Sequence, residues 1–264
     1  MLLSPSRYYG RPQVFSLAST AVMTYASAAS GPASNAPPAQ QSTNPTNGVK
    51  NQSTNKQPDA EPSQPRQKRS PSPAHVPKTD SPEDNVYVLT LLTDKEHHAK
   101  MTKLRDQYFP KKINKLAAHL TLFHALPGSK LEDAIIPTLE KTAAETSEFR
   151  IHAATPFRMK KGIAISIPKH EGAQQCQDIH KRLQSEWLPQ KFLSEQDAGG
   201  CRVHYTICNK VDDEAVVDQY FQEVRRSFKG GWGQVIGLGL WRYARGFWRW
   251  ERGFDFKQGS SEVA

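Results

Sequence analysis

Acidic residues are missing from the first 58 positions of this 264-residue chain, and cysteine is scarce throughout. The first acidic side chain is Asp59, and the three cysteines stand 25 and 7 residues apart. An odd number of widely spaced cysteines does not make the framework of a small disulfide-rich protein, so a reducing compartment is favoured. No stretch reaches the roughly 18 apolar residues that a membrane-spanning helix needs, and we therefore expect no membrane partner.

Two further absences concern cofactors and metals. The Gly-Leu-Gly run at 237–239 lies in a strand pattern and is not followed by a helix, so it is not a nucleotide-binding loop. No zinc framework is present either. In a regular strand Cys201 lies on the Tyr205 side and Cys208 on the His204 side, so these ligand types do not converge. We expect neither a cofactor nor a bound metal ion.

Large apolar side chains are few in the first 85 residues, which hold 13 of the 19 prolines and none of the five tryptophans. Such a segment cannot bury enough surface to offset its chain entropy, so residues 1–85 are predicted to be disordered, as is a tail at 257–264. Residues 1–30 leave three interpretations open: a mitochondrial presequence, a secretory signal and an untargeted tail. We expect an intracellular protein, cytoplasmic or nuclear, with the mitochondrion as the alternative that residues 1–30 allow.

The remaining segment, 86–256, is long enough for one folded domain, and its pattern alternates between strand and helix. Strands are predicted at 86–92, 119–126, 149–157, 162–167, 203–208, 234–243 and 247–256, and helices at 95–109, 130–146, 173–187 and 212–228. Asp94 can cap the first helix, and Pro137 predicts a kink or a later start in the second. The order of elements predicts an α+β fold in two similar halves.

Two tetrapeptides share one pattern, in which histidine, an apolar residue, threonine and an apolar residue follow one another. They are His-Leu-Thr-Leu at 119–122 and His-Tyr-Thr-Ile at 204–207, each at the head of a predicted strand. Because side chains alternate along a strand, the histidine and threonine of each copy point to one face. Chance would produce about 0.07 copies of this pattern in such a chain, so two copies indicate a functional pair.

This pair resembles the two signatures of the 2H phosphoesterase superfamily, which includes 2′-5′ RNA ligase-like and cyclic phosphodiesterase proteins. The resemblance covers about residues 86–256, and the tail from Trp232 resembles that of fungal members. It implies two pseudo-symmetric lobes of antiparallel sheet with flanking helices around a central cleft. It further implies that His119 donates a proton and that His204 accepts one.

The residue types suit the opening of a cyclic phosphate, which needs a base for water and an acid for the leaving oxygen. Histidine fills either role near neutral pH, and ordinary pKa values place the optimum between about pH 6 and 8. Thr121 and Thr206 can each donate a hydrogen bond to a phosphate oxygen. We therefore expect a metal-independent phosphodiesterase acting on 2′,3′-cyclic phosphate or 2′-5′-linked RNA or nucleotide ends. The alternatives are a reversible 2′-5′ RNA ligase and an RNA-binding module without catalysis, and the chain is expected to act as a monomer.

Two other features have competing interpretations. The stretch 241–250 interleaves aromatic residues with arginines, which is typical of single-strand RNA binding but also of a plain strand hairpin. Arg242 and Tyr243 are its candidate substrate contacts. His124 lies five residues after His119, so a regular strand places it on the opposite face, as a core or surface histidine.

Overall fold

The computed structural model describes residues 75–258. The strands are β1 (Val86–Thr93), β2 (Leu120–Pro127), β3 (Phe149–Ala153), β4 (Thr155–Met159), β5 (Gly162–Ser166), β6 (His204–Cys208), β7 (Gly231–Ala244) and β8 (Phe247–Asp255). The α-helices are α1 (Lys95–Tyr108), α2 (Ile136–Glu145), α3 (Ala173–Trp187) and α4 (Glu214–Ser227). The α+β class predicted from the sequence is confirmed. The predictions for residues 1–74 and 259–264 lie outside the described residues.

The strands form two antiparallel sheets. The larger sheet has the order β2-β1-β7-β3, with β8 paired to the distal part of β7, and the smaller sheet has the order β4-β5-β6. Strand β1 is buried from Tyr87 to Thr93, since it pairs with β2 on one edge and β7 on the other. Strand β7, the longest strand, therefore lies in the interior of the sheet, between β1 and β3.

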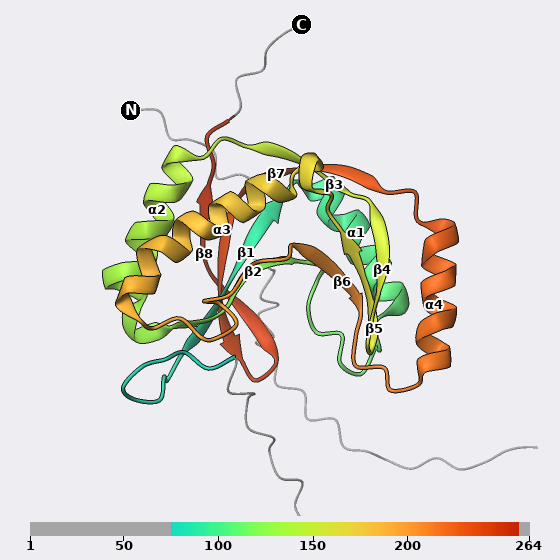
Figure 1. The fold of residues 1–264 in the computed structure, drawn as a ribbon, viewed down its shortest axis with the longest axis horizontal. Helices are drawn as coiled ribbons and strands as arrows, with labels where there is room; N and C mark the ends of the chain where they lie inside the picture. Colours follow the sequence, from blue (N-terminus) through green and yellow to red (C-terminus); the bar gives the residue numbers. More distant parts are fainter. Residues whose placement is uncertain (1–74, 259–264) are drawn as a thin grey trace, which may run out of the picture. The chain divides into compact units, whose positions relative to one another are not determined.

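Two helices lie beside each sheet, and α1 contacts both sheets through β6 and β7. Helices α2 and α3 pack against each other, and α2 also contacts β7 and β8 of the larger sheet. Helix α1 packs on β6, and α4 packs on β4 and β5 of the smaller sheet. Figure 1 shows the two groups on opposite sides, with α2 and α3 by the larger sheet and α1 and α4 by the smaller one. This arrangement is the pair of lobes that the family resemblance implied.

One predicted strand needs correction, and one of the two alternatives for the second helix is confirmed. The segment 149–157 is not one strand, because the chain passes from the larger to the smaller sheet at Ala154, whose N–H donates to the carbonyl of Ser166. The second helix begins late. Pro137 stands in the first turn of α2, where its missing N–H costs nothing, and a π-turn, Leu131–Ile135, precedes it. Asp94 caps α1 as predicted, accepting a hydrogen bond from the His97 N–H at 2.9 Å.

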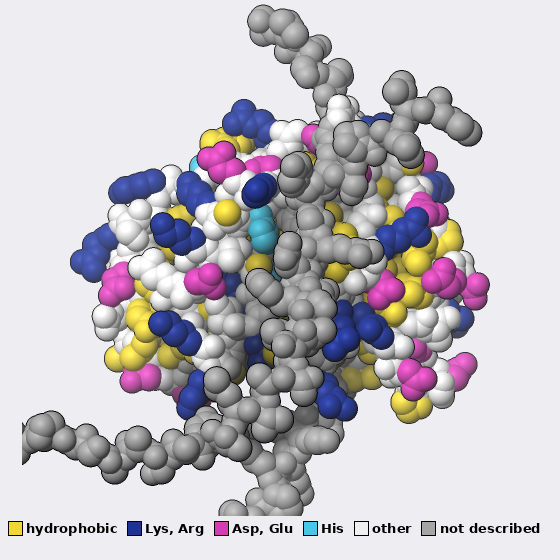
Figure 2. All heavy atoms as spheres, turned by 180° about the vertical axis from the view of Figure 1, so that it is seen from behind, with side chains coloured by type: hydrophobic (Ala, Val, Ile, Leu, Met, Phe, Trp, Pro, Cys, Tyr) yellow, Lys and Arg dark blue, Asp and Glu magenta, His cyan; other side chains and the backbone are white. Residues whose placement is uncertain are grey.

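Charges of both signs are spread over the surface. On the face in Figure 2, wherever described side chains are visible, Lys and Arg alternate with Asp and Glu. Within residues 75–258, no helix combines the length and apolar character that a membrane crossing requires.

The residues just ahead of β1 also pack on the domain. The N–H of Lys78 donates to the carbonyl of Phe192, and Glu83 accepts hydrogen bonds from both the N–H and the hydroxyl of Ser129. Pro77 is buried. These contacts lie ahead of the boundary predicted at residue 86.

Two truncations test the contribution of residues 75–84. Deleting 1–84 is expected to lower the Tm by about 4–8 °C relative to deleting 1–74, because the longer deletion removes hydrogen bonds worth roughly 2 kcal/mol together. Differential scanning calorimetry of the two proteins measures the difference. Equal melting temperatures would show that these contacts contribute no stability.

Candidate active site

The four side chains of the two His-x-Thr motifs line one cavity of about 330 Å³. His119 lies directly before β2 and Thr121 within it, whereas His204 and Thr206 lie on β6 of the other sheet. The other lining residues are Leu122, His124, His180, Gln196, Asp197, Gly200, Cys201, Arg202 and Trp248. The fold thus brings two motifs that are 85 residues apart to one place.

The two histidines are held in the same way. Nδ1 of His119 lies 2.8 Å from the carbonyl oxygen of Ala117, and Nδ1 of His204 lies 2.7 Å from that of Arg202. A carbonyl oxygen only accepts, so the proton of each neutral ring is on Nδ1. Each Nε2 then carries the lone pair that can exchange a proton with a ligand in the cavity.

The apolar positions of each motif explain this orientation. In β2, Leu120 is buried, and Phe123 stacks on His180 of α3 at 4.6 Å between ring centroids. In β6, Tyr205 is buried with its ring 5.6 Å from that of His97 on α1. Each strand therefore packs one face on a helix and turns its histidine and threonine toward the cavity. Within residues 75–258, neither motif hydroxyl has a hydrogen-bond partner, so both are available to a ligand.

A β-bulge follows the threonine in both motif strands. Thr121 pairs with Thr90 but Phe123 pairs with Leu89, so Leu122 is the extra residue of β2. Register shifts in the same way in β6, where Ile207 is the extra residue between Thr206 and Cys208. A bulge reverses the alternation of side chains beyond it.

The bulges correct two predictions about faces. His124 is not on the side opposite His119, since the reversal at Leu122 turns it into the same cavity. There it lies 3.4 Å from the buried carboxylate of Asp197, which also accepts the N–H of His124 at 2.8 Å. Cys208 turns away from the His204 side and is fully buried.

Burial and neighbouring cations lower the pKa of both motif histidines. Burial, together with the positive charge of Arg105, lowers the pKa of His119 to about 4. Burial also lowers the pKa of His204, and the charge of Arg202 acts in the same direction. The charges of His124 and His204 act on the pKa of His119 in the same direction, as smaller contributions.

Arg105 of α1 donates hydrogen bonds to the backbone of both motif segments. Its Nε donates to the Leu116 carbonyl at 3.0 Å, three residues before His119, and its Nη1 donates to the Thr206 carbonyl at 2.6 Å. The side chain is buried and stacks on Phe109 at 3.7 Å. Within residues 75–258 it has no carboxylate partner, and burial lowers its pKa to about 10. It is thus a buried cation that fixes both motif segments.

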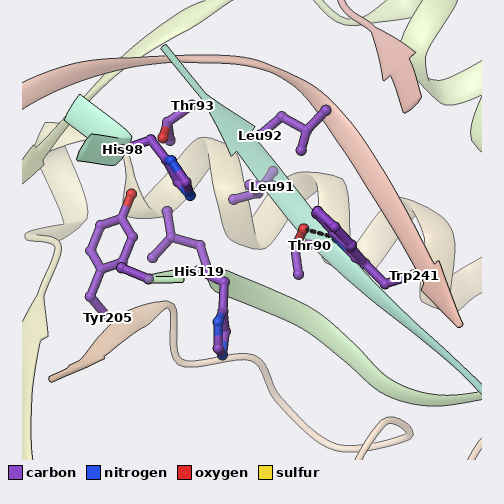
Figure 3. A pocket seen from close by; sticks show the side chains of 10 residues that line it. Thr90, Leu91, Leu92, Thr93, His98, His119, Tyr205 and Trp241 are labelled. Carbon is purple, nitrogen blue, oxygen red and sulfur yellow. Dashed lines mark hydrogen bonds between the residues drawn. The ribbon is translucent and has the colours of Figure 1, made fainter. Parts of the chain in front are cut away.

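A small cavity of about 20 Å³ lies behind His119. Figure 3 shows it between Tyr205 of β6 and the β1 side chains, with the Trp241 indole bonded to the Thr90 hydroxyl. That hydrogen bond, from Nε1 at 2.9 Å, anchors β7 to the cavity face of β1. Gly239 leaves room for the indole, because a Cβ there would lie 3.1 Å from Trp241 Nε1 and 2.6 Å from Leu92 Cδ2.

Aromatic rings flank the two histidines. The Trp248 ring lies 4.4 Å from that of His119, and the Phe157 ring lies 5.8 Å from that of His204, both measured between centroids. The guanidinium of Arg202 lies 4.2 Å from the Phe157 centroid. Sequence reasoning missed Trp248, Phe157 and Arg202, although Arg202 stands two residues before a motif histidine.

Strand register separates the two predicted substrate contacts of the hairpin. Tyr243 pairs with Trp248, so both side chains share one face of the β7–β8 hairpin, but Tyr243 is 50% exposed and does not itself line the cavity. Arg242 pairs with Arg249 and with Tyr87, which places it on the opposite face. The prediction of Arg242 as a substrate contact is therefore not supported by its position.

No metal site can be recognised from side-chain clustering in residues 75–258, where no group of three His, Cys, Asp or Glu side chains is placed to hold an ion. Cys201 lines the active-site cavity, but burial raises the pKa of its thiol to about 11. It is therefore a neutral thiol rather than a thiolate ligand or nucleophile.

Several solved structures are similar to this chain. A phosphoesterase crystal structure matches with 12% identity and a TM-score of 0.46 over 67% of this chain and 100% of its own. Escherichia coli LigT, crystallised with 3′-AMP, matches with 13% identity and a TM-score of 0.42, over 66% of this chain and 99% of its own. Kluyveromyces marxianus Usb1 matches with 13% identity and a TM-score of 0.36, over 60% and 93%.

No curated protein sequence matches the chain. The family model of the 2′-5′ RNA ligase superfamily matches residues 93–247, which is more than half of the sequence and includes both His-x-Thr motifs. The chain therefore belongs to the 2′-5′ RNA ligase superfamily, the 2H phosphoesterases.

Proposed function

We propose that this phosphoesterase-type protein is a metal-independent phosphodiesterase that acts on 2′,3′-cyclic phosphate or 2′-5′-linked ends of RNA or nucleotides. One observation carries the proposal. His119 and His204 line the same cavity, and each is held through Nδ1 by a carbonyl two residues earlier, so both Nε2 atoms are available to one ligand. Such a pair supplies a general acid and a general base.

The reaction would proceed by direct attack of water on phosphorus. Following the family resemblance, Nε2 of neutral His204 takes a proton from the water as its oxygen bonds to phosphorus. The bond from phosphorus to one ribose oxygen breaks, and Nε2–H of protonated His119 delivers its proton to that oxygen. The pair together carries one proton at the start and one at the end, shifted from one ring to the other, and a solvent proton exchange restores the first state.

The threonines and the arginine would stabilise the charge that develops on phosphate. Thr121 and Thr206 each offer a hydroxyl on the cavity face, and Arg202 brings a cation to the rim beside His204. Hydrogen-bond donors aimed at such charge typically contribute 10²–10³-fold in rate, about 2.7–4 kcal/mol. Tyr243 remains a proposed contact for the base or ribose next to the reacting phosphate.

A direct test uses the full chain and a 5′-labelled RNA that ends in a 2′,3′-cyclic phosphate, incubated in EDTA. We expect complete conversion to a single monophosphate isomer, with its position read by nuclease and phosphatase mapping. Binding without conversion would favour the RNA-binding module instead. Joining to a second RNA with a 5′-hydroxyl end would favour the ligase, and loss of conversion in EDTA would rule out the metal-independent reaction.

A further inference from the structure

Two segments beside the active site carry an unusual concentration of positive charge. The loop at 110–119 ahead of β2 holds Lys111, Lys112 and Lys115, and the β7–β8 hairpin at 241–250 holds three arginines. Neither segment contains an aspartate or a glutamate. Arg242 and Arg249 pair with each other on the face opposite Tyr243 and Trp248, so four cations remain for the cavity side: Lys111, Lys112, Lys115 and Arg245. A group of cations in segments without acidic residues is the electrostatic pattern that a polyanion seeks.

The two segments touch each other and the active site. Nζ of Lys115 lies 4.4 Å from the ring centroid of Phe247, which joins the loop to the end of the hairpin. His119 ends the same loop, and its ring contacts Trp248 of the hairpin at 4.4 Å. We call residues 110–119 and 241–250 together the loop–hairpin surface.

The same surface exposes large hydrophobic side chains, two of them aromatic. Six large hydrophobic side chains are exposed within residues 75–258, and three of them belong to the loop–hairpin surface: Ile113 at 40%, Tyr243 at 50% and Phe247 at 52%. Exposed rings beside cations suit stacked bases with a phosphate backbone. A carboxylate-rich or purely apolar partner would not match this combination.

A two-residue turn connects β7 and β8 of the hairpin. Arg245 has φ of 51° and Gly246 has φ of 89°, the left-handed backbone of a two-residue turn that continues the twist of both strands. Tyr243 and Trp248 form a cross-strand pair, and the Trp248 ring also contacts His119, so the three side chains follow one face from the cavity toward the turn. In Figure 1 the turn projects at the lower edge of the fold, away from α2 and α3.

We propose that single-stranded RNA runs out of the catalytic cavity along the loop–hairpin surface, so that the substrate is an oligonucleotide end rather than a free mononucleotide. Trp248 and Tyr243 stack the nucleotides nearest the reacting phosphate. Phe247, Lys115 and Arg245 hold the nucleotides beyond them. The proposal rests on the proposed function for the identity of the reacting end, but the binding surface itself is measurable without turnover.

The test measures binding of fluorescein-labelled single-stranded RNAs of one, three, six and nine nucleotides, each ending in a 3′-phosphate, by anisotropy in the full chain. We expect the Kd to tighten by at least about tenfold from one to nine nucleotides, with a salt dependence that steepens with length. The double variant Lys115→Ser/Phe247→Ala should lose most of that gain. The matched control is Lys229→Ser/Trp232→Ala, which removes an exposed cation and an exposed tryptophan near the start of β7, roughly 35 Å along the strand from Tyr243.

Three outcomes would overturn the proposal. These are a Kd that does not change with length, an equal loss in the control variant, and displacement of RNA by poly-glutamate of matched charge as readily as by unlabelled RNA. Turnover assays separate this result from the proposed function. Length-dependent binding that is lost in the double variant, in a protein that opens no cyclic phosphate, would support the surface and refute the phosphodiesterase.

Discussion

Replacing His119 or His204 by alanine is expected to lower kcat/KM for a cyclic-phosphate RNA end by at least about 10²-fold. Each substitution removes either the general acid or the general base, and such groups typically contribute 10²–10⁴-fold. Both side chains line the cavity and are anchored by a single hydrogen bond, so their loss should leave the packing of β2 and β6 intact. Steady-state kinetics together with thermal melting measures both expectations.

Three variants serve as controls for the histidine result. Thr121→Val and Thr206→Val should each cost about 10-fold or more but less than the histidine changes, because each removes one donor to the phosphate. His170→Ala, at an exposed position outside the cavity lining, should have little effect. A near-normal rate in His119→Ala or His204→Ala would contradict the two-histidine mechanism, and a threonine effect larger than both would require new roles.

Arg105→Met is expected to lower kcat/KM by about 10–10²-fold, although Arg105 does not line the cavity. The guanidinium holds the carbonyls of Leu116 and Thr206, one in each motif segment. Loss of the guanidinium leaves these carbonyl acceptors unpaired, at a cost of about 1–3 kcal/mol each. The two motif segments are then no longer held in the relative position that the reaction requires. Arg225→Met, at an exposed position on α4, is the matched control.

The pH profile separates positioning by Arg105 from a purely structural role. Its positive charge lowers the pKa of His119, so Arg105→Met should raise that pKa and move the acidic limb of kcat/KM to higher pH. Arg105→Lys keeps the positive charge but loses the planar guanidinium that donates to two carbonyls. The kcat/KM of this variant should therefore fall while the acidic limb of its pH profile stays in place. An acidic limb that does not move in Arg105→Met would show that the charge plays no part.

The fold could be predicted well from the sequence wherever hydrophobic periodicity is strong. The predicted helix 173–187 coincides with α3, and β1 and α1 agree with prediction to within a residue. Strand 149–157 failed because nothing in its local pattern reveals that the two halves belong to different sheets, an outcome decided by pairing with β7 and β5. Local propensity predicts that a segment forms a strand, whereas tertiary contacts determine the strand with which it pairs.

The site was predictable as a motif but not as a cavity. The repeated His-x-Thr pattern identifies four side chains that line it, whereas His124 was missed because strict alternation does not anticipate the bulge at Leu122. A shift of one residue exchanges the two faces of a strand. Cross-strand register places Trp248 at the cavity, and a long-range hydrogen bond connects Arg105 to a motif strand. The sequence carries no short-range signal for either contact.

The most direct test of the two-histidine account is the pH dependence of kcat/KM for a cyclic-phosphate RNA end, measured in EDTA. The pair is active when it holds one proton, so the profile should be bell-shaped with limbs that belong to the pair. Since burial lowers the pKa of both His119 and His204, the maximum should fall below pH 6.5 rather than in the range of ordinary histidines. A rate that rises steadily to pH 9 without EDTA and disappears when EDTA is added would instead indicate a metal-bound hydroxide, and would contradict the assignment of these two residues as acid and base.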